Sequence, residues 1–198
     1  MVFATVPGNL FSPRFYVTSD PKSGLLSTPT QRRLIAVPSL LIDSIYETLQ
    51  EEAGQASFLA LYTFGRAWGK SFWERAQREI ETYYHSPIAN FNAIEFFALM
   101  QELWAVHGLG KITTDFSRMS KGMLLVTVRN SSISQGIGSA NPKSYSLEAG
   151  FLAGWFSGLT EKQLAACAVD WKNAPAKLVY AVASEGDIEK WQSKSTSV

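Results

Sequence analysis

Three residues of this chain belong to the types that most often bind a metal ion or form a thiol–imidazole nucleophile: Cys167, His85 and His107. A structural zinc site needs four such ligands, and a catalytic site needs three together with water. The three residues stand in separate predicted elements with no short metal-binding spacing, so we predict no metal ion. Because residue alternation turns Cys167 inward with Val169 and Trp171, and buried thiols are usually inert, we predict no cysteine nucleophile.

A ridge of glycines is the most distinctive spacing in the chain. Gly150, Gly154 and Gly158 recur every fourth residue, so on a helix they form one smooth strip. Phe151 and Trp155 form a bulky stripe beside it. Each glycine inside a helix costs roughly 1 kcal/mol relative to alanine. The ridge therefore predicts a compensating close approach, either by a backbone or by a flat ligand.

A second, shorter glycine ridge stands earlier in the chain, where Gly65 and Gly69 lie four residues apart beside Trp68 and Phe72. Paired ridges and an aromatic content of 13% suit a mostly apolar slot for a flat molecule. The alternative is that the ridges only allow tight helix packing. The predicted ligand-binding residues are Gly65, Trp68, Gly69, Phe72, Gly150, Phe151, Gly154, Trp155 and His107.

Hydrophobic periodicity indicates which elements must position these residues. Helices are predicted at about 38–52, 55–84, 91–107 and 145–160, and strands at about 112–116, 123–129, 166–171 and 177–183. In the third helix, the expected inner face holds Ile94, Phe97, Ala98, Gln101, Trp104 and Ala105. Helices followed by a hairpin, twice over, are typical of an α+β fold. We expect a four-stranded antiparallel sheet with four to five helices packed on one face.

The predicted domain covers residues 38–184, between an extended arm at 1–37 and a polar tail at 185–198. The arm is rich in proline but carries Phe11, Phe15 and Tyr16. Exposed aromatic side chains are common interface anchors, so we predict a homodimer or hetero-complex, with these three residues as the anchors if the arm clamps the partner. For the arm itself, packing on its own domain is favoured over packing on a partner.

The segment 145–184 resembles the C-terminal half of the 4-vinyl-reductase domain family. The matching positions are Gly150, Gly154, Phe156 and Leu159 in the helix and Cys167 as the first cysteine of the following hairpin. The chain departs from the pattern where Ala176 replaces the second cysteine and Lys172-Asn173 replaces the Gly-Asp turn. The resemblance implies an α+β domain related to trafficking-complex subunits, with a hydrophobic ligand pocket. In photosynthetic members it implies an association with chlorophyll biosynthesis or photosystem assembly.

That resemblance directs the functional hypotheses. The first is a non-enzymatic binding protein for a tetrapyrrole such as chlorophyll or a precursor, acting in pigment delivery or photosystem assembly. His107 is its candidate ligand to the central metal, although histidines at helix ends commonly interact with terminal carbonyls instead. The second is a protein–protein interaction scaffold without a ligand. The third is a vinyl-tetrapyrrole reductase, which is disfavoured because Gly136 and Gly138 form only a partial dinucleotide fingerprint.

Net charge and the lengths of the apolar runs exclude two further classes of protein. Eighteen basic and seventeen acidic residues give a net charge of +1, which is not the basic footprint of a nucleic-acid-binding protein. No apolar run reaches the roughly 18–20 residues that span a bilayer. The first fifteen residues lack the basic start of a signal peptide, so we predict a cytoplasmic protein that can lie at the periphery of a photosynthetic membrane.

Overall fold

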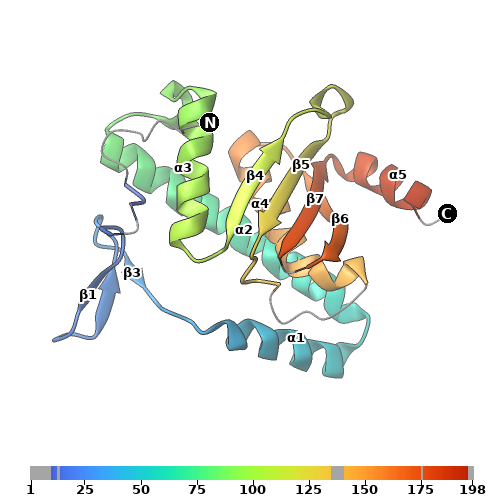
Figure 1. Cartoon of the computed structure of the whole chain (residues 1–198), viewed down its shortest axis with the longest axis horizontal. Helices are drawn as coiled ribbons and strands as arrows, with labels where there is room; N and C mark the ends of the chain where they lie inside the picture. The colour runs from blue at the N-terminus through green and yellow to red at the C-terminus, as the bar shows by residue number, and fades with distance from the viewer. Residues whose placement is uncertain (1–9, 13, 135–140, 175, 196–198) are drawn as a thin grey trace.

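The computed structural model describes residues 10–12, 14–134, 141–174 and 176–195, with side chains up to residue 190. Its α-helices are α1 (Ser39–Ala53), α2 (Ala56–Tyr84), α3 (Ala93–Val106), α4 (Ser146–Thr160) and α5 (Glu185–Ser195). Its strands are β1 (Thr18–Asp20), β2 (Leu25–Ser27), β3 (Arg33–Leu34), β4 (Lys111–Asp115), β5 (Leu124–Arg129), β6 (Ala165–Asn173) and β7 (Lys177–Ala183). Figure 1 shows α2 and α4 behind the larger sheet, with α1 below it.

The larger sheet has the strand order β4-β5-β7-β6, and every neighbouring pair is antiparallel. This confirms the predicted four-stranded antiparallel sheet. One face packs on α4 through alternate small and large residues, and the other face carries Ala165, Cys167 and Ala181, which form a second apolar cluster with Ile188 of α5. Small side chains leave that face shallow, so a short amphipathic helix can cover it. The helices therefore do not all lie on one face, and the predicted polar tail forms α5.

A β-bulge changes the side-chain alternation in β6. The pairing with β7 shifts register between Ala168 and Asp170 and again before Asn173. An extra residue in one strand reverses which face the following side chains occupy. Cys167 and Val169 belong to the cluster under α5, whereas Trp171 packs against the main core. The predicted common face of Cys167, Val169 and Trp171 is therefore wrong at Trp171.

The glycine ridges meet each other across the contact between α2 and α4. A Cβ atom added to Gly154 would overlap the carbonyl oxygen of Arg66 and would lie 2.9 Å from the amide nitrogen of Lys70. Gly69 meets the backbone of Phe151 in the same way, and Gly65 and Gly150 meet the backbones of Leu147 and Tyr62. Both helices thus approach at backbone contact. This contact fixes the position of every aromatic residue that α4 presents to the core.

The start of the described chain folds back onto the domain. Phe11 and Tyr16 are buried, and their rings are in edge contact with centroids 5.2 Å apart. Tyr16 donates a hydrogen bond to the buried carboxylate of Glu79 in α2 at 3.1 Å, and Thr30 donates to the same carboxylate at 2.7 Å. Arg32 adds an ion pair to Glu79 at 3.2 Å. These contacts join the small β1-β2-β3 sheet to α2.

The arm therefore covers its own core, the packing that the sequence favours for it, and does not clamp a partner through Phe11 or Tyr16. Phe11 and Tyr16 are not available as anchors for a partner, because both lie inside the chain's own hydrophobic cluster. Phe15 is 72% exposed, so it alone of the three predicted interface residues faces solvent. The physical reason is that Glu79 offers the arm a buried carboxylate, which Tyr16 and Arg32 satisfy.

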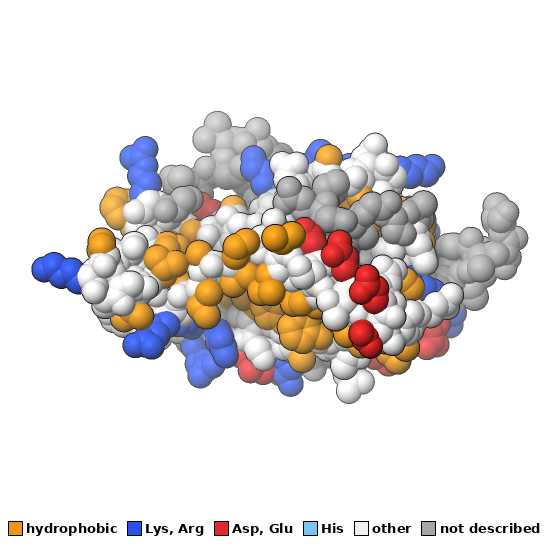
Figure 2. Space-filling model, turned by 90° about the horizontal axis from the view of Figure 1, so that it is seen from below, with side chains coloured by type: hydrophobic (Ala, Val, Ile, Leu, Met, Phe, Trp, Pro, Cys, Tyr) orange, Lys and Arg blue, Asp and Glu red, His pale blue; other side chains and the backbone are white. Residues whose placement is uncertain are grey.

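The helix α1 touches the body along only part of its length. Pro38 precedes it and Gly54 ends it with a positive φ of 51°, and proline and glycine are the residue types that favour these two positions. Its buried anchor is Tyr46, while Leu40 and Leu41 are exposed. Figure 2 shows apolar side chains gathered on the face that includes α1, beside a row of acidic ones. No helix among the described residues is long and apolar enough to cross a membrane.

Candidate ligand-binding site

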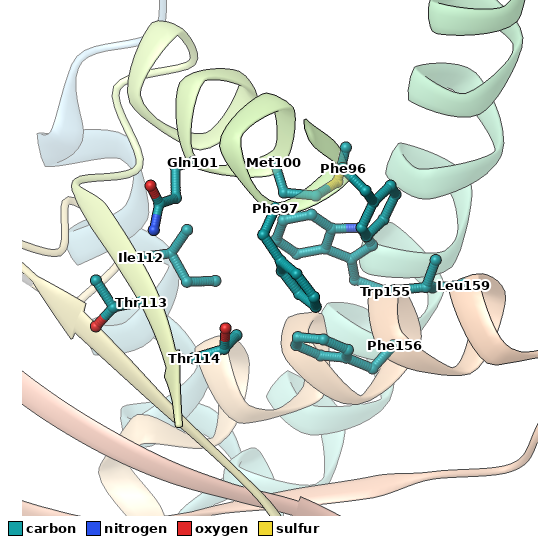
Figure 3. A pocket seen from close by; sticks show the side chains of 10 residues that line it. All are labelled: Phe96, Phe97, Met100, Gln101, Ile112, Thr113, Thr114, Trp155, Phe156 and Leu159. Carbon is teal, nitrogen blue, oxygen red and sulfur yellow. The ribbon is translucent and has the colours of Figure 1, made fainter. Parts of the chain in front are cut away.

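A pocket opens where α3, the edge strand β4 and α4 meet (Figure 3). It contains about 320 Å³ of empty space, counted with its open mouth. Its lining residues are Phe96, Phe97, Met100 and Gln101 of α3, Ile112, Thr113 and Thr114 of β4, and Trp155, Phe156 and Leu159 of α4. The lining is mostly apolar and aromatic, with three neutral polar side chains, which is the usual composition of a small-molecule site.

Local sequence explains why these elements form the pocket. Asn92 and Glu95 make a reciprocal capping box that starts α3, with hydrogen bonds of 2.9 and 3.3 Å between side chains and backbone. Adjacent pairs one turn apart, Phe96 with Phe97 and Met100 with Gln101, then project toward the edge of the sheet. The strand β4 is the edge strand of the larger sheet, next to β5, and it packs against α3.

The inner face of α3 is rotated relative to the prediction. Phe96, Leu99 and Leu103 are buried, whereas Ile94 is 78% exposed and Ala105 is exposed. The expected face was assigned from one helical period, but α3 is apolar on most of its circumference, so periodicity alone did not choose the buried side. Side-chain packing against the neighbouring helices decided which residues are buried: Phe96 contacts Trp73 of α2, and Trp104 stacks on Trp155 of α4.

An aromatic cluster forms the floor behind the pocket. Trp104 stacks on Trp155 with ring centroids 4.8 Å apart and planes inclined by 12°. Phe151 lies edge-on to Trp104 at 5.4 Å and to Trp68 at 4.6 Å. Phe72 lies 5.4 Å from Phe151. Of the predicted ligand-binding side chains, Trp155 lines the pocket, and Trp68, Phe72 and Phe151 support it from behind.

The four predicted glycines lie away from the pocket mouth. Gly65, Gly69, Gly150 and Gly154 are buried between α2 and α4, where each faces backbone atoms of the other helix. A ligand could contact them only if the two helices separated. Their placement matches the alternative reading of the ridges, in which they permit close helix packing.

His107 is held inside the domain. Its Nδ1 lies 2.8 Å from the carbonyl oxygen of Leu103, which can only accept, so Nδ1 carries the proton. Its ring contacts Tyr16 and Phe72 at 5.3 and 4.9 Å. Burial lowers the pKa of His107 and keeps the imidazole neutral near pH 7. His107 thus contacts a terminal carbonyl of α3, the role named as the alternative to ligand binding.

The remaining candidate metal-binding and nucleophilic residues lie on separate elements. His85 is exposed at the end of α2, and Cys167 is buried under α5. Within the described ranges, no three His, Cys, Asp or Glu residues are placed to hold a metal ion. The partial dinucleotide fingerprint at Gly136 and Gly138 lies outside the described residues.

Sequence reasoning missed most of the pocket lining. Nine of the ten lining residues were not predicted as ligand-binding residues: Phe96, Phe97, Met100, Gln101, Ile112, Thr113, Thr114, Phe156 and Leu159. The pocket joins side chains from three elements, and a single sequence does not show how a helix and an edge strand meet. The available signal was Gln101, a neutral polar residue one turn after the aromatic pair at 96–97 on a mostly apolar helix.

No family model matches the chain, and no curated protein matches it. Among solved structures, it resembles the phenol-responsive sensory domain of the transcription activator PoxR, determined with phenol. The TM-score is 0.66 at 15% sequence identity, and the match covers 94% of this chain and 96% of that domain. This likeness establishes a shared fold.

A vinyl-4-reductase family protein from Methanocaldococcus jannaschii also matches, with a TM-score of 0.47, 15% identity and coverage of 75% of this chain and 82% of that one. That similarity is too low to support an argument. Membership of the 4-vinyl-reductase family therefore stays a prediction from the sequence.

Proposed function

We propose that this protein is a non-catalytic binding domain for a small, flat, uncharged aromatic molecule. The observation that carries the proposal is the pocket between α3, β4 and α4, whose walls include Phe96, Phe97 and Trp155. Flat rings stack well on such side chains. None of the lining residues is charged, so an ionised ligand would lose its hydration without gaining a counter-charge. The phenol-responsive domain of PoxR provides a precedent for a ligand of this kind in the same fold.

A tetrapyrrole, the ligand predicted from the family resemblance, is the rival. The size of the pocket favours a single ring over a macrocycle, because the empty space is only about 320 Å³ even when the open mouth is counted. A macrocycle seated on the glycine ridges instead would need α2 and α4 to part along their backbone contact. A role in pigment delivery or photosystem assembly depends on that larger ligand and stays a prediction.

Titration with phenol and with protoporphyrin, each followed by tryptophan fluorescence, tests the proposal. Phenol is expected to bind the parent protein, and Thr114→Phe is expected to weaken phenol binding by about tenfold, because overpacking typically costs 1–3 kcal/mol. The matched control is Thr48→Phe on the exposed side of α1, which should leave affinity unchanged. Binding of protoporphyrin but not phenol would favour the rival. Phenol binding that Thr114→Phe leaves intact would place the ligand elsewhere.

A second function, assembly with another protein chain, is favoured by the apolar segment at 35–41. Ile35 is 84% exposed, and Val37, Leu40 and Leu41 are also exposed within seven residues. Monomers rarely leave such a run uncovered. We propose that this segment, and not Phe11 or Tyr16, contacts the partner in the predicted homodimer or hetero-complex.

Light scattering of the purified protein tests that assembly. The parent is expected to have at least twice the mass of one chain, and Leu40→Glu is expected to shift it toward the monomer by placing a charge in the contact. Ile94→Glu on α3 is the control, since Ile94 is also largely exposed but lies outside the segment. A parent protein that is monomeric at all concentrations and copurifies with no partner would contradict the proposal.

A further inference from the structure

The lining of the pocket divides into a polar side and an aromatic side (Figure 3). The polar side holds the neutral residues Gln101, Thr113 and Thr114, and the aromatic side holds rings from α3 and α4, among them Phe97 and Phe156. A flat ring can stack on the aromatic side. A substituent of that ring that points to the other side then meets a carboxamide and two hydroxyl groups.

Gln101 is a polar residue of α3 that the fold itself does not use. Its neighbour Glu95 completes the capping box at the start of the helix. Among the residues that the structure describes, by contrast, none forms a hydrogen bond with the Gln101 carboxamide. Gln101 follows Phe97 by one helical turn, so both side chains project from one face of α3 into the pocket. The side chain is half-buried, so a molecule in the pocket can reach it.

The two threonines are less suited to hold a ring substituent. Thr113 is exposed, so water already surrounds its hydroxyl group, and Thr114 offers one hydroxyl on a short side chain. The Gln101 carboxamide has two donor hydrogens and an acceptor oxygen at the end of a longer side chain. It can therefore pair with a hydroxyl, an ether or a carbonyl group without help from a second residue.

We infer that Gln101 selects the ligand through a hydrogen bond between its carboxamide and a neutral polar substituent on the aromatic ring. This inference rests on the proposed function and narrows its ligand class to one-ring molecules with a hydroxyl, ether or carbonyl group. A hydrocarbon ring would use the aromatic side of the pocket but would leave the carboxamide without a partner on the ligand. An ionised substituent is disfavoured because no lining residue is charged.

Three one-ring probes test this hydrogen bond in NMR titrations. Phenol can donate and accept, anisole can only accept, and toluene can do neither. Gln101→Met keeps the length of the side chain but removes its polar groups. Phenol and anisole are expected to bind this variant about fivefold more weakly, as the loss of one hydrogen bond predicts, whereas toluene should bind at least as tightly as before. Gln50→Met, at an exposed position of α1, is the matched control and should leave all three affinities unchanged.

Gln101→Glu separates a direct hydrogen bond from a structural role of Gln101. An ionised carboxylate has a similar shape but only accepts, so at pH 7 the variant should still bind phenol, which can donate to it, and should bind anisole about fivefold more weakly. Equal changes for phenol, anisole and toluene in either variant would overturn the inference while leaving the pocket assignment intact. Failure of all three probes to bind the parent protein would instead overturn the proposed function.

Discussion

Replacing Gly154 with alanine is expected to lower the free energy of unfolding by about 1–3 kcal/mol, the usual cost of overpacking a well-packed core. The added methyl group would overlap the backbone of Arg66, with the carbonyl carbon at 2.8 Å and the amide nitrogen of Lys70 at 2.9 Å. Backbone atoms inside a helix cannot move alone, so α2 and α4 would have to separate. In a thermal melt this corresponds to a loss of roughly 2–4 °C per kcal/mol.

Two other glycines give a graded comparison. Gly186 in α5 has nothing within 4 Å of an added Cβ atom, so Gly186→Ala should be neutral or should stabilise α5 by up to about 1 kcal/mol. Gly158 faces the side chain of Trp73 at 2.5 Å, and a side chain can shift where a backbone cannot. Gly158→Ala should therefore fall between the other two variants. If Gly154→Ala melts like the parent, the backbone contact between α2 and α4 is wrong.

The sequence predicted the elements better than their contacts. Helix boundaries at Pro38 and Gly54, and the strand at Lys177–Ala183, follow from capping residues and alternation, which are local properties. The glycine ridges predicted a close approach but left open what approaches. Only the crossing of α2 with α4 answers that question, because the two ridges are about eighty residues apart in the chain and each is the partner of the other.

The candidate site was less predictable for the same reason. Trp155 was identified because it stands beside a glycine ridge, whereas Thr113 and Thr114 carry no local signal of a pocket. The bulge in β6 could not be predicted from the sequence, because an extra residue in one strand is defined only by its pairing with the partner strand. The hydrogen bonds that hold the arm on Glu79 join residues about fifty to sixty positions apart. A single sequence contains no direct signal for such pairs.

Replacing Glu148 is expected to have the second large effect on stability. It lies in α4 and is fully buried, and three hydroxyl groups donate hydrogen bonds to its carboxylate. Ser131 donates at 2.8 Å, Ser134 at 2.8 Å and Tyr180 at 2.6 Å. Glu148→Ala would leave these three hydroxyls without their acceptor and would open a cavity, so we expect a loss of roughly 3 kcal/mol in the free energy of unfolding. Denaturant melts of the variant measure this loss.

The pH dependence of stability distinguishes the charge of Glu148 from its packing. Burial raises the pKa of Glu148 above its ordinary value of 4.5, although the three hydrogen bonds oppose that rise. Between 4.5 and its raised pKa, the folded state binds the proton more strongly than the unfolded state does. The contribution of Glu148 to stability therefore falls as the pH increases through this window and is constant above it.

Glu148→Gln is the variant that isolates this contribution, because glutamine keeps the shape but does not titrate. The difference in stability between parent and variant should shift in favour of the variant as the pH rises from 4.5, and should then level off. Because other carboxylates titrate equally in parent and variant, their effects cancel in the comparison. A difference for Glu148→Gln that is flat from pH 4.5 to 8, or that shifts in favour of the parent, would show that burial does not outweigh the hydrogen bonds from Ser131, Ser134 and Tyr180.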